Sequence, residues 1–247
     1  MKLSISLPSI YPAALERTLK NIQATTRSDH EVLVVSPTRP PNIGNVIWVQ
    51  DFVNQGCNAG HCQALIKARG EFLFPFCDDH LLKPDWDIVL ISEFRAREFL
   101  VGQPFMLGVR QDTREGQVGT VFGIYYPYFP LMRTADAKAS GWYQPDFRAG
   151  FGDCDLALRF WYAGGKIEWS GEGWLLVHKD DERKGSTLTT EADMALFLSR
   201  WRWTYGKKWP CADLRDFNRD VTFAGLPKSC RTFSPTDRAF FADRQYA

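Results

Sequence analysis

Two adjacent carboxylates, Asp78 and Asp79, follow an apolar run at residues 71–77. Carboxylate oxygens are the ligands that hard cations such as Mg²⁺ or Mn²⁺ prefer, and a cation held in this way can bind phosphate oxygens. Aspartate is also common in turns. Taken alone, the pair therefore fits either a metal site or a simple turn.

A second acidic pair, Asp153 and Asp155, opens a predicted helix at residues 151–163. Both can complement the helix dipole at its N-terminus. Asp155 precedes Arg159 by four residues, a spacing that predicts an ion pair within the helix. Asp153 lies at the mouth of the helix, where a carboxylate can accept a proton from a substrate hydroxyl. A base and a dipole-complementing role both remain open for Asp153.

His178 ends another apolar run and is followed by a charged segment. A lone histidine after a strand is usually structural, but imidazole can join carboxylates around Mn²⁺. The charged segment is either a solvated loop or a lid whose Arg183 and Lys184 reach a diphosphate.

The first half of the chain alternates short apolar runs with helical patterns. These predict strands at residues 2–7, 31–36, 45–50 and 71–77, one helix that opens at Pro12, and another at 60–69 that ends before Gly70. Such alternation predicts right-handed β–α–β units and an α/β fold with a parallel sheet. Ligands bind beyond the carboxyl ends of such strands, which places residues 8–11, 36–39 and 77–80 along one rim.

The second half shows no domain linker. Residues 119–133 are rich in β-forming residues and predict strands, and helices are expected at 151–163 and 191–203. The last forty residues are polar and irregular. For the tryptophan-rich stretch at 199–209 we favour core packing with a basic edge, and an acceptor platform or a dimer contact are the alternatives.

Composition excludes several classes of protein. The 247 residues are 45% hydrophobic and 24% charged, as in an ordinary globular domain, and the net charge of +1 lacks the basic surplus of nucleic-acid-binding proteins. The chain shows no membrane-spanning apolar run and no secretory signal, so we expect a soluble cytoplasmic protein. Its six cysteines form no C-x-x-C pair and are expected to be reduced and mostly structural.

Several catalytic signatures are missing. The sequence has no G-x-x-x-x-G-K-[ST] loop and no G-x-G-x-x-G, which disfavours ATPases and dinucleotide-binding enzymes. It also lacks the G-x-S-x-G nucleophile elbow and the zinc-deaminase signature.

Four segments together resemble glycosyltransferase family 2, which has the GT-A fold. In chain order they are SISLPSIY, IKARGEFLFPFCDDHLLKPDW, SGWYQPDFRAGFGDCDLALRFWYAGGKI and LLVHKDD. They lie between residues 3 and 186. Each motif is weak alone, and their order and spacing carry the resemblance.

The resemblance implies a GT-A-like, mostly parallel nucleotide-binding sheet flanked by helices and fused to an acceptor-binding half. The whole chain, residues 1–247, would then be a single catalytic domain. Residues 1–110 would bind the nucleotide sugar and 111–190 would form the acceptor and catalytic half. Residues 191–247 would be a C-terminal helical and irregular extension.

The resemblance also implies an inverting glycosyltransferase that moves a sugar from a nucleotide-sugar donor, a UDP-sugar being favoured, to an acceptor hydroxyl. Asp153 matches the catalytic base of the family, and Trp142 matches its acceptor site. The implied ligands of a Mn²⁺ or Mg²⁺ cofactor are Asp79 and His178. The residues implied to contact the donor are Pro8, Ser9, Tyr11, His61 and Asp78.

Four positions depart from the pattern of the family. The D-x-D motif reads Cys77-Asp78-Asp79, and Gly152 replaces the glutamate that precedes the base. The second strand ends in Ser36-Pro37-Thr38, without the aspartate that reads uracil, and His61 takes the approximate place of an arginine. The nucleobase, the sugar, the acceptor and the oligomeric state therefore stay open.

Two other functions remain as alternatives. One is a non-catalytic module that keeps the fold and only binds a sugar or a partner, which the altered motif positions allow. The other is a nucleotidyltransferase, which the segment SIYPAAL disfavours because such enzymes usually carry a Gly-rich basic loop after the first strand.

Overall fold

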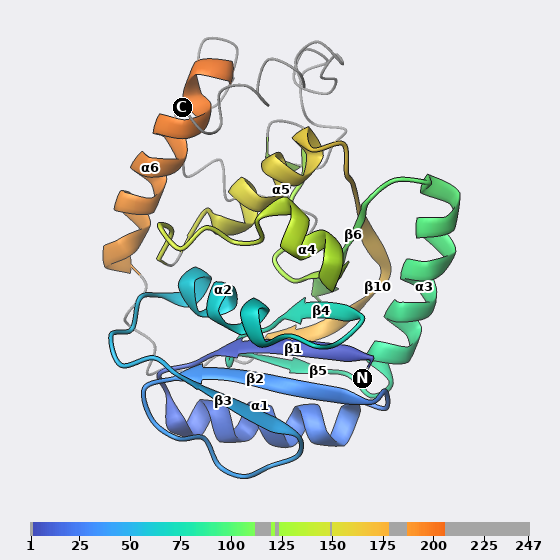
Figure 1. The fold of residues 1–247 in the computed structure, drawn as a ribbon, viewed down its shortest axis with the longest axis vertical. Coiled ribbons are helices and arrows are strands. Elements are labelled where there is room, and N and C mark those ends of the chain that lie inside the picture. The colour runs from blue at the N-terminus through green and yellow to red at the C-terminus, as the bar shows by residue number, and fades with distance from the viewer. Residues whose placement is uncertain (1, 112–119, 122–123, 149, 178–186, 206–247) are drawn as a thin grey trace.

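The computed structural model describes residues 2–111, 120–121, 124–148, 150–177 and 187–205. Among these residues, eight strands form one sheet in the order β3-β2-β1-β4-β9-β6-β10-β5, with helices packed around it (Figure 1). Pairing is parallel from β3 through β2 and β1 to β4, and also between β6 and β10. The strands β9 and β5 run antiparallel to their neighbours. The prediction of an α/β fold with a mostly parallel sheet is confirmed.

The strands of this sheet are β1 (Leu3–Pro8), β2 (His30–Ser36), β3 (Val46–Gln50), β4 (Phe72–Pro75), β5 (His80–Leu82), β6 (Phe105–Gln111), β9 (Pro130–Arg133) and β10 (Lys166–Val177). Outside this sheet, β7 (Thr120–Val121) pairs antiparallel with β8 (Ile124–Tyr125). The described helices are α1 (Pro12–Thr25), α2 (Cys57–Lys67), α3 (Trp86–Val101), α4 (Thr134–Ser140), α5 (Gly152–Tyr162) and α6 (Thr187–Tyr205).

The sheet separates two apolar clusters, because successive strand residues point to opposite faces. On β2, Val32 and Val34 join the cluster that contains residues of α1 and α3, whereas Leu33 and Val35 join the cluster that contains residues of α2, α4, α5 and α6. Burial on both faces explains why β2 and β4 read as continuous apolar runs in the sequence.

Small side chains let α2 approach the end of β1 closely. A Cβ added at Gly60 would lie 2.7 Å from Cβ of Pro8, so the helix and the strand touch at this point. One turn earlier, the backbone N–H of Cys57 donates to the carbonyl of Arg148 at 2.9 Å. The helix therefore begins at Cys57, three residues before the predicted start, with its first turn against the loop that precedes α5.

The predicted end of α2 at Gly70 is wrong. The helix ends at Lys67, and its C-cap is Ala68, whose N–H donates to the carbonyl of Leu65. Gly70 is needed for another reason, since a Cβ there would lie 2.5 Å from the backbone nitrogen of Ser4 in β1. The glycine permits this close approach of two backbones rather than a left-handed helix end.

The later elements follow the predictions with shifted bounds. Strands β7, β8 and β9 fall within the predicted 119–133 stretch, and α6 starts four residues earlier than predicted. Trp201 in α6 is 3% exposed and belongs to the core, as favoured for the tryptophan-rich stretch. Residues 206–209 of that stretch lie outside the described residues.

The four cysteines in the described part of the chain, Cys57, Cys62, Cys77 and Cys154, are free thiols. Cys211 and Cys230 lie outside it. Within the same described ranges, no helix has the length and apolar character needed to cross a bilayer.

Candidate active site

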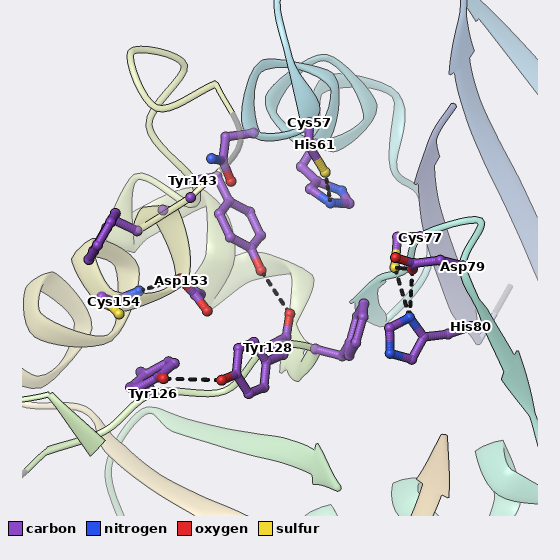
Figure 2. A pocket seen from close by; sticks show the side chains of 15 residues that line it. Cys57, His61, Cys77, Asp79, His80, Tyr126, Tyr128, Tyr143, Asp153 and Cys154 are labelled. Atoms are coloured by element: carbon purple, nitrogen blue, oxygen red, sulfur yellow. Dashed lines mark hydrogen bonds and ion pairs between the residues drawn. The ribbon is translucent and has the colours of Figure 1, made fainter. Parts of the chain in front are cut away.

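A cavity of about 380 Å³ lies beyond the carboxyl end of β4 (Figure 2). Its walls come from the start of α2, the segment between β4 and β5, the segment between β8 and β9, and the loop that leads into α5. Open α/β sheets bind ligands at this position. The cavity brings together three of the predicted site residues, His61, Asp79 and Asp153.

The ends of β1 and β4 are joined by a hydrogen bond from the hydroxyl of Ser9 to the carboxylate of Asp78. Asp78 is 5% exposed, and its carbonyl accepts hydrogen bonds from Arg17 at 3.1 Å and Thr18 at 3.3 Å. Because β1 and β4 are parallel, their carboxyl ends meet at one edge, which confirms the predicted rim for residues 8–11 and 77–80. Asp78 is not among the residues that line the cavity.

The residues on either side of Ser9 lie along the same rim. Pro8 pairs with Val35 in the sheet, and the backbone N–H of Tyr11 donates to Oγ of Ser9 at 3.2 Å. Tyr11 is 38% exposed, and neither Pro8 nor Tyr11 lines the cavity.

Asp79 turns its carboxylate into the cavity, beside two other potential metal ligands. Its Oδ1 lies 2.6 Å from Nδ1 of His80 and accepts a hydrogen bond from the thiol of Cys77. Figure 2 shows these three side chains on one side of the cavity and Asp153 on the other. His80 was not among the predicted site residues, although an imidazole directly after an acidic pair is a visible signal.

Asp153 sits in the first turn of α5, where its Oδ1 accepts the backbone N–H of Cys154 at 2.9 Å. Burial raises the pKa of Asp153 to about 6, and the hydrogen bond from Cys154 opposes this shift. A carboxyl with this pKa is mostly ionised at neutral pH and still basic enough to take a proton from a hydroxyl in a transition state.

Gly152, which replaces a glutamate of the family pattern, contacts Asn58 of α2. A Cβ at position 152 would lie 2.4 Å from Nδ2 of Asn58. The same amide nitrogen donates to the carbonyl of Phe147 at 2.9 Å, which holds Asn58 in place. Glycine is therefore required at position 152, because Asn58 fills the space that a side chain next to the predicted base would occupy.

His61 is a neutral group in this structure. Its Nδ1 lies 2.7 Å from Oγ of Ser6, and its ring stacks on Tyr143 with ring centroids 5.0 Å apart. Burial lowers the pKa of His61 to about 3. Its Nε2 lies 3.4 Å from Sγ of Cys57, so both ring nitrogens have partners, and the imidazole is uncharged at pH 7.

Trp142, the predicted acceptor residue, lies in the core. Its side chain is 1% exposed and does not line the cavity. The next residue, Tyr143, lines the cavity instead, together with Tyr126, Tyr128 and Phe129. Aromatic residues do form a wall of the cavity, but the predicted tryptophan packs behind it.

The predicted Asp155–Arg159 ion pair is present, with Nε of Arg159 2.7 Å from Oδ2 of Asp155. Both side chains are buried, and Arg159 also donates to the carbonyls of Ser140 and Trp142. The other oxygen of Asp155 accepts Nε1–H of Trp201 at 3.0 Å. The pair therefore ties the chain segment before Tyr143 to α5 and α6, and Asp155 has a structural role.

A third carboxylate, Asp193 of α6, holds the loop before α5. Its two oxygens accept the backbone N–H groups of Arg148 at 3.0 Å and Gly150 at 2.8 Å. Asp193 is 3% exposed. Asp193 was not predicted as a site residue, and the backbone groups that it binds lie more than forty residues away in the sequence.

The predicted metal ligand His178 and the basic residues Arg183 and Lys184 lie outside the described residues. The last described residue before His178 is Val177 of β10, which pairs with His80 of β5.

Comparisons with known proteins give a structural match only. No protein-family model matches the chain, and no curated protein matches it. The solved structure of S. aureus TarS 1–349 matches with a TM-score of 0.56 and 14% identity, covering 87% of this chain and 77% of that chain.

The same TarS region in complex with UDP matches with a TM-score of 0.56 at 14% identity, again over 87% of this chain and 77% of that chain. The UDP-GlcNAc complex matches with a TM-score of 0.55 at 13% identity, over 87% and 78%. TarS is a GT-A-like glycosyltransferase. At this level of identity the similarity establishes the fold, and the chain has the GT-A-like fold of TarS, as its four motifs predict.

Proposed function

We propose that the chain is an inverting glycosyltransferase that moves a sugar from a nucleotide-sugar donor to an acceptor hydroxyl. The observation that carries the proposal is the position of Asp79 and Asp153, which line one cavity although they are 74 residues apart in the sequence. The two carboxylates suit the two tasks of the reaction, one near the diphosphate and one near the acceptor. TarS, which shares the fold, has been solved with UDP and UDP-GlcNAc, which supports a UDP-sugar donor.

The donor would lie along the rim formed after β1 and β4. In this proposal Pro8, Ser9 and Tyr11 contact the nucleoside, and Asp78 positions that contact through its hydrogen bond with Ser9. His61, which lines the cavity, would contact the donor as a neutral imidazole. Because no cationic side chain stands at position 61, the charge of the diphosphate must be met elsewhere.

Asp79 is the group proposed to hold a divalent cation at the diphosphate, with His178 as a further ligand. The fit is supported by the carboxylate of Asp79, which faces the cavity beside an imidazole and a thiol. A bound cation would supply positive charge to the leaving nucleoside diphosphate without a proton transfer.

Asp153 would act as the base on the acceptor side. Its carboxylate takes the proton of the acceptor hydroxyl while that oxygen attacks the anomeric carbon, and the bond from this carbon to the diphosphate oxygen breaks. Attack from the face opposite the leaving group inverts the anomeric carbon, so no covalent enzyme intermediate forms. The pKa of about 6 suits this role at neutral pH.

The acceptor would pack against the aromatic wall. Tyr143 stacks on His61, which places an aromatic ring between His61 and Asp153 (Figure 2). Aromatic faces suit the C–H faces of pyranoses, so a saccharide hydroxyl is the acceptor that this wall favours. Trp142 would act only by supporting Tyr143, since the two rings meet edge to face at 5.0 Å.

The test is to incubate the purified chain with a panel of nucleotide sugars and a divalent cation and to measure the nucleoside diphosphate released. We expect slow hydrolysis of at least one UDP-sugar even without acceptor. No release with any donor, together with no metal-dependent nucleotide binding, overturns the proposal. Nucleotide-sugar binding without release points to the alternative, a module that keeps the fold and only binds.

A further inference from the structure

Cys77, Asp79 and His80 present three different metal-ligating groups to one point of the cavity. The Sγ, carboxylate and imidazole ligand atoms all lie within 4.8 Å of one another. Among the described residues, this is the cluster of three potential metal ligands that lies close enough to hold one ion. Sγ of Cys77 is 3.2 Å from Nδ1 of His80, which is 2.6 Å from Oδ1 of Asp79. All three residues line the cavity, so a ligand in the cavity can reach an ion held between them.

We propose that Cys77, Asp79 and His80 form a site for a borderline transition-metal cation such as Zn²⁺, and that the site discriminates against Mg²⁺. Thiolate, imidazole and carboxylate are the three ligand types that Zn²⁺ takes in proteins. Mg²⁺ requires near-octahedral oxygen ligands and keeps much of its water, so a sulfur and a nitrogen ligand suit it poorly. Binding of the ion does not depend on the proposed glycosyl transfer. A role for the ion at a diphosphate does depend on that proposed function.

The distances permit binding after a small movement. Metal–ligand bonds of about 2.0–2.3 Å in a tetrahedral arrangement place the ligand atoms about 3.4–3.6 Å apart. The sulfur–nitrogen pair at 3.2 Å is close to this value, whereas the nitrogen–oxygen pair at 2.6 Å and the still closer sulfur–oxygen pair must each open by about 1 Å. The thiol proton leaves to solvent as the Cys77 sulfur binds the ion. A fourth position of the ion would be left open to a ligand other than these three side chains.

Asp78, the other acidic residue of the pair, is not a ligand in this proposed site. Its carboxylate accepts a hydrogen bond from the hydroxyl of Ser9, and Asp78 does not line the cavity. Another thiol on the wall belongs to Cys57, whose Sγ contacts Nε2 of His61 at 3.4 Å. The donor set is therefore Cys77, Asp79 and His80, and it differs from an all-carboxylate site.

The test is a titration of the metal-free full chain with Co²⁺, which reports thiolate ligation by a charge-transfer band in the near ultraviolet and tetrahedral ligation by bands in the visible. We expect both sets of bands in the parent chain. Cys77→Ser should remove the charge-transfer band, and His80→Gln and Asp79→Asn should weaken or remove the visible bands. Zn²⁺ should displace Co²⁺ at stoichiometric amounts, whereas a large excess of Mg²⁺ should not.

Matched controls are Cys57→Ser, which alters another thiol of the same cavity, and Cys62→Ser, whose thiol donates to the carbonyl of Tyr143 instead. Both should retain the Co²⁺ bands, and thermal melting shows which variants are folded. Bands that persist in Cys77→Ser, or displacement by Mg²⁺ as effective as that by Zn²⁺, overturn the proposal. Nucleotide-sugar turnover supported by Mg²⁺ in a chain without Co²⁺ bands overturns this site alone and leaves the proposed function intact.

Discussion

The side-chain amide of Asn58 fills the space that a Cβ at Gly152 would occupy, with Nδ2 only 2.4 Å from that position. Asn58 is also held by its hydrogen bond to the carbonyl of Phe147. Glycine at 152 and asparagine at 58 therefore act as a unit that sets the first turn of α5 against α2. A glutamate at position 152, as in the family pattern, does not fit this arrangement.

Gly152→Ala is expected to destabilise the fold by about 1–3 kcal/mol, because the added methyl group overpacks the contact with Asn58. Asn58→Ala alone removes the hydrogen bond to Phe147 and is expected to cost about 1 kcal/mol. The double variant should cost less than the sum of the two, since the shortened residue 58 leaves room for the methyl group.

Denaturant unfolding of the parent, both single variants and the double variant measures this coupling. A glycine-to-alanine control in open space, such as Gly164→Ala, would not isolate the steric effect. Gly164 has a φ of +89°, so alanine there would add backbone strain. Additive free energies of unfolding would show that the Gly152–Asn58 contact is not a steric one.

Asp153→Asn is expected to lower transfer by at least about 100-fold while donor affinity stays within a few-fold, because the amide cannot accept the hydroxyl proton. The amide retains the size of the side chain and an oxygen for the N–H of Cys154. Single-turnover rates and equilibrium binding of the donor separate the two effects. If the variant loses donor binding instead, Asp153 is a structural or metal-binding residue and the proposed mechanism is wrong.

The pH dependence of kcat/KM should show an acidic limb near pH 6. Burial raises the pKa of Asp153 to about 6, so its carboxylate is protonated, and unable to act as a base, below that pH. Activity should therefore rise as the pH increases through this value and level off above it. His61 should not contribute to the limb, because burial lowers its pKa to about 3.

A His61→Gln variant checks that assignment, since it should keep the same acidic limb while any change appears in donor affinity. A limb that disappears in His61→Gln would assign the titration to the histidine and remove the support that the pKa gives to Asp153.

The parallel part of the fold could be predicted because its information is local. Apolar runs separated by helical patterns defined β1 to β4, and parallel pairing then required residues after β1 and β4 to meet, as Ser9 and Asp78 do. The strand β5 has only three residues, which is too short to show a period, and its pairing with β10 depends on tertiary contacts. The adjacency of His80 to Asp79 is visible in the sequence, but the approach of its Nδ1 to both Asp79 and Cys77 depends on the folded turn.

The wall of the cavity was harder to predict because aromatic residues look alike in a sequence. Trp142 and Tyr143 are neighbours, but only Tyr143 lines the cavity. Arg159, held by its ion pair with Asp155, donates to the carbonyl of Trp142 and so holds the backbone at this point. That restraint links residues on α5 to a loop, and no local pattern reports it. The role of Asp193 is equally invisible, because the backbone groups that it binds lie more than forty residues away in the sequence.

Asp193→Ala is expected to lower kcat more than donor affinity, because the loop before Asp153 loses its anchor. The variant leaves the N–H groups of Arg148 and Gly150 without their acceptor and should cost about 1–3 kcal/mol of stability. Asp193→Asn, which keeps one acceptor oxygen, should fall between the parent and the alanine variant in both properties. The matched control is Asp146→Ala in the same loop, whose exposed pair with Arg200 contributes about 0–1 kcal/mol. Kinetics at saturating donor and thermal melting measure the two effects, and equal losses for Asp146→Ala and Asp193→Ala contradict a positioning role.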